Sequence, residues 1–187
     1  MSTSSERDRE RSLFEEPTEA IERVDAWDGP LGFLVGGMAN QSRLQLAEQY
    51  FDAASVLTEG ILARRWEDYR LVNPILFLYR HALELLLKTV MEDSAKTHHL
   101  GELVDALVMY VKNEFHTDIP QWIPSRIREF ALIDPNSTAF RYSENRDPAT
   151  KQYGAVDGEF HVDLLHLQWV MNEIKLALSH LSIAHHP

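Results

Sequence analysis

Cysteine is absent from the 187 residues, and its absence excludes several kinds of chemistry. Without thiols the chain cannot form disulfides, cannot bind zinc through sulfur and cannot use a cysteine nucleophile. Its stability must therefore come from packing alone.

Long apolar runs are also missing. Residues 1–11 are polar and charged where a secretory signal would have an apolar stretch. No later segment reaches the length of uninterrupted apolar sequence that spans a bilayer. We therefore expect a cytoplasmic protein that does not contact membranes.

The motifs of several enzyme classes are missing as well. The chain contains no Gly-x-Gly-x-x-Gly or Gly-Lys-Ser/Thr phosphate loop, no His-Glu-x-x-His zinc motif and no Gly-x-Ser-x-Gly nucleophile turn. The glycine-rich segment 27–37 is interpreted as a loop laid on the domain. His161 and His166 are five residues apart, off the spacing that aligns two ligands on a helix. We expect no metal ion and no cofactor.

Basic residues are outnumbered by acidic ones. The 29 Asp and Glu residues against 18 Lys and Arg give a formal net charge of −11. This charge opposes sequence-independent binding to nucleic acid, which stays possible as a partner only through a local basic patch. Residues 1–28 hold nine acids and four arginines, a net charge of −5. This composition predicts a polar tail over residues 1–25 that is disordered or forms a short helix over 14–24.

Apolar residues recur at three- and four-residue spacing through most of the remaining chain. At this length, with 44% hydrophobic residues, we expect one helical domain over residues 26–187. The spacing predicts four long helices over about 40–64, 74–92, 99–113 and 163–183, and a short helix over 125–133. The predicted N-caps are Asn40 or Ser42, Asn73 followed by Pro74, Thr97, Ser125 and Asp163. The fold class is therefore all-α, an antiparallel bundle of four long helices with a short helix and a long loop before the last helix.

The predicted helix over 74–92 is apolar around nearly its whole circumference and should lie at the centre of the bundle. Its polar residues share one side of the helix: Arg80, His81, Glu84 and Lys88. The favoured interpretation is a face exposed to water or a structural ion pair beneath the loop 136–159. The other interpretation is a binding site, and its candidate residues are Arg80, His81, Glu84, Lys88, His98, His99, Arg141 and Tyr142.

The loop 136–159 carries many turn-forming and polar residues, and a long loop in a compact domain is often functional. Its expected anchors are Phe140, Tyr142, Tyr153 and Val156. Because a guanidinium can hold a carboxylate with two parallel hydrogen bonds, we predict that Arg141 docks on Glu84.

The order of these features resembles that of bacterial members of the HEPN superfamily. The residues that carry the resemblance, over roughly residues 40–183, are Asn73-Pro74, the segment Tyr79–Lys88, Thr97-His98-His99-Leu100, Asp134-Pro135 and Phe140-Arg141-Tyr142. The resemblance implies an antiparallel bundle of four long helices, frequent homodimerisation and a role in defence, toxin–antitoxin or mobile-element systems. Catalytic members are metal-independent RNases with an Arg followed, after a gap of four to six residues, by a His. No arginine of this chain has a His at that spacing, so no catalytic residue is carried over.

Two functions stay open. The favoured one is a non-catalytic HEPN-like module that forms a homodimer and binds a protein or nucleotide-like partner. Its dimer is predicted from the apolar faces of the second and last helices. The alternative is a metal-independent RNase, with His as general base and Arg stabilising the negative charge of the transition state. Its site would be assembled from Arg80, His81, His98, His99 and Arg141.

Overall fold

The computed structural model describes residues 40–91, 97–135, 137–142 and 158–185, together with Val156 and a few isolated positions before residue 38. The chain divides into two units, residues 1–40 and 41–187. Most of the predicted tail, of the loop over 27–37 and of the loop 136–159 lies outside the described residues. The helical unit that follows residue 40 is described below.

The helical unit contains five helices: α3 (Arg43–Leu62), α4 (Asp68–Val90), α5 (Leu100–Phe115), α6 (Trp122–Ile133) and α7 (Leu164–His185). The described ranges contain no strand. The predicted all-α fold class, with four long helices and one short one, is therefore confirmed.

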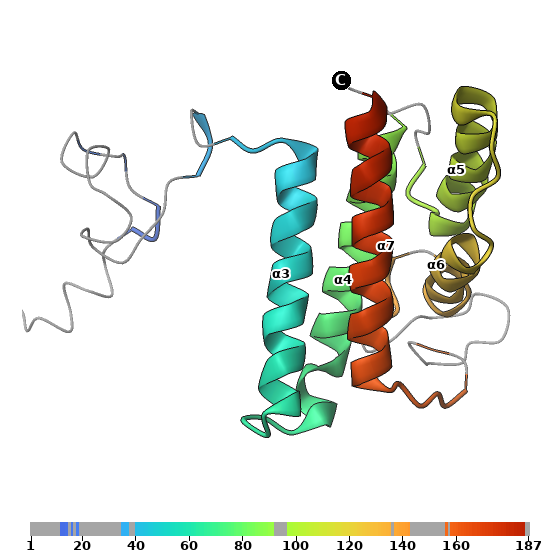
Figure 1. The fold of residues 1–187 in the computed structure, drawn as a ribbon. Helices are drawn as coiled ribbons and strands as arrows, with labels where there is room; N and C mark the ends of the chain where they lie inside the picture. The colour runs from blue at the N-terminus through green and yellow to red at the C-terminus, as the bar shows by residue number, and fades with distance from the viewer. Residues whose placement is uncertain are drawn as a thin grey trace, which may run out of the picture. The chain divides into compact units, whose positions relative to one another are not determined.

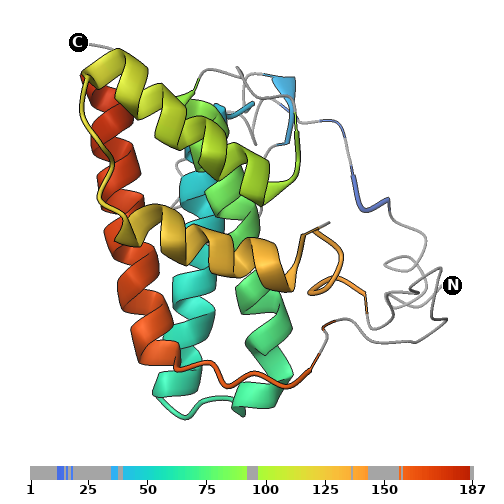
Figure 2. The ribbon, with the colours of Figure 1, turned by 90° about the vertical axis from the view of Figure 1, so that its right-hand side faces the viewer.

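The helices form two layers. Helices α3, α4 and α7 stand side by side, with α3 antiparallel to both of the others (Figure 1). Helices α5 and α6 pack on each other and cross the first layer on the side away from α3 (Figure 2). Helix α4 contacts α3, α5 and α7, so the prediction that this helix lies at the centre is confirmed.

The core is built around the apolar side chains of α4. Tyr79, Leu83 and Leu87 are fully buried there, together with Phe51 of α3 and Met171 of α7. The second layer adds the following buried residues to the same core: Leu100, Leu103, Leu107 and Ile127. Burial of each such side chain contributes about 1.5–3 kcal/mol, which is how a chain without disulfides stabilises its fold.

Three helix ends agree with the sequence. Ser42 is the N-cap of α3 and forms a capping box with Gln45, so the second of its two predicted caps is confirmed. The Asp163 carboxylate accepts hydrogen bonds from the first backbone N–H groups of α7. Helix α6 ends at Ile133, where Asp134 precedes Pro135 and leaves the helical region as expected.

The start of α4 was predicted wrongly. Helix α4 begins at Asp68, so Pro74 lies inside it. The earlier start lets Leu71 pack on the core, which offsets the hydrogen bond that proline cannot donate. Helix α5 begins at Leu100, next to its predicted start, but its N-cap is His99 and not Thr97, whose hydroxyl accepts the N–H of His99.

The short helix also begins earlier than predicted. Helix α6 starts at Trp122, and Ser125 lies within it. The Ser125 hydroxyl donates to the carbonyl of Gln121 instead of accepting a hydrogen bond from the first turn. The earlier start buries Ile123 and Pro124, an apolar gain that a local capping signal cannot reveal.

Candidate functional site

Arg80 is the centre of the polar face of α4. Its side chain is fully buried, with 0% exposure. Nη1 donates to Glu84 Oε2 at 3.2 Å, Nη2 donates to the carbonyl of His98 at 3.2 Å, and Nε donates to the carbonyl of Asp134 at 3.2 Å. All three guanidinium nitrogens are therefore used, and they connect α4 to the start of α5 and the end of α6.

Glu84 lies one turn further along α4 and is only 3% exposed. Its Oε1 accepts hydrogen bonds from Lys88 Nζ at 3.1 Å and from His98 Nδ1 at 2.7 Å. Burial raises the pKa of Glu84, but the hydrogen bonds and charges of His98 and Lys88 outweigh burial, and the pKa lies below its ordinary value. The carboxylate is thus held in its charged form by three donors, the third being Arg80.

Asp134 completes this group, which we call the Arg80 cluster: Arg80, Glu84, Lys88, His98 and Asp134. The Asp134 carboxylate is buried, and its Oδ2 lies 3.2 Å from Arg80 Nε. Its Oδ1 accepts the backbone N–H groups of Thr138 and Ala139 at 2.7 and 3.0 Å. Asp134 therefore connects the buried guanidinium to the turn that follows α6.

Arg141 does not dock on Glu84, so that prediction was wrong. The Arg141 guanidinium lies over the rings of Phe77 and Tyr142, at 5.7 and 5.6 Å from their centroids, and Nε donates to the carbonyl of Ser137. The turn bound to Asp134 fixes this position near the earlier part of α4. Glu84 has no need of Arg141, because three other donors already hold it.

The expected loop anchors differ in their burial. Phe140 is buried, as predicted, and fixes the turn after α6. Tyr142 is exposed, so its predicted role as an anchor was wrong, and its ring is instead one of the two that face Arg141. Val156 is half-buried, and Tyr153 lies outside the described residues.

His81 packs as an aromatic ring. It meets Tyr50 of α3 edge to face, with centroids 4.6 Å apart, and stacks on Phe77 at 5.9 Å. Burial lowers the pKa of His81, and the charges of Arg80, Arg141 and Lys88 lower it further, against an opposing effect of Glu84. His81 is therefore neutral near pH 7 and serves the contact between α3 and α4.

The two histidines before α5 differ in what they leave exposed. The His98 ring is 80% exposed, although its Nδ1 is bound to Glu84. That short contact assigns the proton to Nδ1 and leaves Nε2 open to solvent. His99 Nδ1 lies 3.2 Å from the carbonyl of Pro135, so this second exposed ring ties the start of α5 to the residue after α6.

The predicted site residues therefore fall into two groups. Arg80, Glu84, Lys88 and His98 come together in the Arg80 cluster, with His99 beside it. His81 instead lies with Phe77, whose ring also faces Arg141. Asp134 was missed, because it was interpreted only as the end of the short helix and the start of a turn.

Within the described part of the chain, no three His, Asp or Glu side chains are arranged to hold a metal ion. None of the described helices combines the length and the apolar composition that crossing a bilayer requires. These residues define an all-α bundle whose central helix carries a buried ion-pair cluster. Comparison with known proteins yields no matching family model, no matching curated protein and no significantly similar solved structure.

Proposed function

We propose that the chain is a non-catalytic HEPN-like helical module that forms a homodimer and binds a protein or nucleotide-like partner. The observation that carries the proposal is that the Arg80 guanidinium is buried and hydrogen-bonded within the protein. An arginine that stabilises a developing phosphorane charge must direct free N–H groups at the reacting phosphate. Every guanidinium nitrogen of Arg80 is instead bound to a protein oxygen, and the side chain has no exposure.

The cluster has a structural role in this proposal. Arg80 binds the carboxylates of Glu84 and Asp134 and the carbonyls of His98 and Asp134, which fixes the start of α5 and the turn after α6 on α4. Buried charges that satisfy one another in this way favour a single arrangement of the segments that carry them. The partner-binding surface then lies elsewhere on a rigid bundle.

A seam on the outer face of α7 supports the homodimer. Leu165, Trp169 and Leu176 are exposed there, and together with the exposed Asn172 they follow a spacing of four, three and four residues. This is the heptad spacing by which two helices pack knobs into holes. A polar Asn within such a seam selects one register and oligomeric state, which suits a second copy of the same helix.

The homodimer is tested by sedimentation of Trp169→Glu at tens of micromolar. The matched control is Met109→Glu on α5, since Met109 is 59% exposed and Trp169 60% exposed. We expect dimer for the unaltered chain and for the control, and monomer for Trp169→Glu, because a charge in the seam opposes its burial. A monomeric unaltered chain would contradict the proposed dimer.

One specific observation favours the alternative function, a metal-independent RNase. Glu84 orients the His98 ring through Nδ1 and leaves Nε2 exposed, an arrangement that suits a general base. In an RNase of this kind the exposed Arg141 would supply the positive charge. RNA cleavage with divalent metal chelated separates the two functions. Activity that disappears in both His98→Ala and Arg141→Met would favour the RNase.

A further inference from the structure

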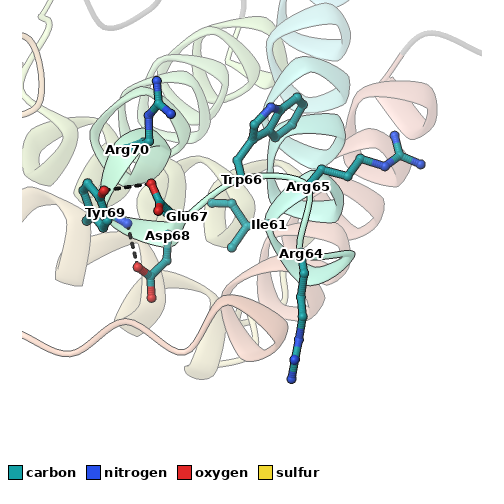
Figure 3. A pocket seen from close by; sticks show the side chains of 8 residues that line it. All are labelled: Ile61, Arg64, Arg65, Trp66, Glu67, Asp68, Tyr69 and Arg70. Atoms are coloured by element: carbon teal, nitrogen blue, oxygen red, sulfur yellow. Dashed lines mark hydrogen bonds between the residues drawn. The ribbon is translucent and has the colours of Figure 1, made fainter.

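The turn between α3 and α4 forms an open hollow of about 640 Å³. The following residues line it: Ile61, Arg64, Arg65, Trp66, Glu67, Asp68, Tyr69 and Arg70 (Figure 3). The turn therefore concentrates arginine and aromatic side chains at one end of a helix pair.

The turn has a defined backbone. The N–H of Arg65 donates to the carbonyl of Gly60 and the N–H of Arg64 donates to that of Ile61, each at 2.8 Å. Arg64 adopts a left-handed conformation, with φ of 55°, which ends the helix as a glycine ordinarily would. These bonds fix the direction in which the chain enters α4.

Trp66 is seated against α3 at Gly60. A Cβ added to Gly60 would lie 2.0 Å from Cζ3 of the Trp66 ring, so the ring occupies the space that any side chain there would fill. The indole is still 42% exposed. Because one part of the ring is held against the helix, the exposed part is presented without the loss of side-chain freedom that a mobile tryptophan would incur on binding.

The charges of the turn are of both signs. Arg64, Arg65 and Arg70 are exposed, and none of the three forms an ion pair within the described residues. Glu67 accepts a hydrogen bond from the hydroxyl of Tyr69, and Asp68 accepts the Tyr69 N–H, each at 2.7 Å. The arginines extend in different directions, with Arg70 on the same side of the turn as Trp66 and Arg64 on the opposite side (Figure 3).

This mixture favours a protein over a nucleic acid. A nucleic acid strand carries a phosphate at every nucleotide and would bring phosphates against the exposed carboxylates of Glu67 and Asp68. A protein segment can place its acids on the arginines and keep them away from those carboxylates. Trp, Tyr and Arg are also the residues that contribute most to binding energy at protein interfaces.

We propose that the turn between α3 and α4 is the docking site for a partner protein segment in which acidic residues flank one large apolar side chain. The apolar side chain enters the hollow against Trp66 and Ile61. The flanking carboxylates meet Arg65 and Arg70. This inference rests on the partner-binding part of the proposed function and assigns it a surface.

The test uses the full chain and a fluorescein-labelled peptide of the sequence Ser-Asp-Glu-Phe-Asp-Glu-Ser, and binding is followed by fluorescence anisotropy. We expect saturable binding that weakens at least about tenfold in the double variant Arg65→Glu, Arg70→Glu, because each new carboxylate faces an acid of the peptide. Gly60→Ala leaves every charge in place and should weaken binding several-fold, because the added Cβ displaces the Trp66 ring from its position against α3. Lys112→Glu on α5 is the control for a charge reversal away from the turn and should stay within about twofold.

A second measurement locates the bound peptide. Titration of ¹⁵N-labelled protein should shift the backbone amide signals of residues 60–70 and leave those of α7 unchanged. The inference is overturned if peptide binding does not saturate at concentrations up to about 1 mM. It is also overturned by equal weakening in Lys112→Glu, by shifts confined to another surface, or by tighter binding of an oligouridylate RNA. If the unaltered chain does not bind the peptide, but is a dimer and does not cleave RNA, only this inference is contradicted and the proposed function stands.

Discussion

Replacing Arg80 with methionine tests the Arg80 cluster directly. Methionine keeps most of the side-chain volume but removes the donors that serve the carbonyls of His98 and Asp134. Each buried carbonyl left without a partner costs about 1–3 kcal/mol. Glu84 retains Lys88 and His98, which limits the penalty on its charge. The expected loss is therefore about 3–5 kcal/mol, as for other broken buried ion pairs.

Urea unfolding followed by circular dichroism measures this loss. The matched control is Arg128→Met, which removes an exposed arginine whose Nη2 lies 2.6 Å from Asp105 Oδ1. That exposed pair should contribute about 1 kcal/mol or less in spite of its short distance. Since small domains are stable by about 5–15 kcal/mol, Arg80→Met should still fold and remain measurable. A loss no larger than that of Arg128→Met would refute the structural role of Arg80.

Two further predictions concern pH and the turn between α3 and α4. The lowered pKa of Glu84 stabilises the fold above the ordinary glutamate value of about 4.3, and this contribution is lost as the pH falls through the folded-state pKa. The stability advantage of the unaltered chain over Glu84→Gln should therefore shrink as the pH falls below about 4.3 in urea unfolding, and a constant difference would contradict the assigned charge state. In the Trp66→Ala background, Gly60→Ala should stabilise α3 by about 1 kcal/mol through helix propensity, whereas with Trp66 present it should give no gain. Equal effects in both backgrounds would show that the ring does not rest on Gly60.

The helix ends that could be predicted were those set by local chemistry. Ser42 and Asp163 cap their helices with their own side chains, so the signal lies within a few residues of sequence. The start of α4 was missed because the proline rule is local, whereas the helix extends backward to pack Leu71 on a distant core. Tertiary packing overrode the local preference there.

The site was predictable only in part for the same reason. Helical spacing alone brought Arg80, Glu84 and Lys88 to one side of α4. The further partners of Arg80 are carbonyls from two other segments, and their approach depends on how α5 and α6 cross α4. Arg141 was placed wrongly because the turn held by Asp134 fixes its position.

The turn between α3 and α4 was not predicted to be a binding surface. The predicted helix ran to about Arg64, and the residues from Arg65 to Arg70 were given no role. The signal that could have revealed it is the alternation of three arginines with Trp66 and Tyr69 between two strongly apolar segments. Its hollow, however, depends on the packing of the Trp66 ring against Gly60, a contact that exists only in the folded chain.

The most direct test of the central claim is an RNA-cleavage assay on the purified chain with divalent metal chelated. We predict no cleavage in the absence of a partner, because each guanidinium nitrogen of Arg80 is hydrogen-bonded within the protein. Cleavage that survives repurification, and that is abolished by His81→Ala or by His98→Ala, would contradict the assignment of a non-catalytic module.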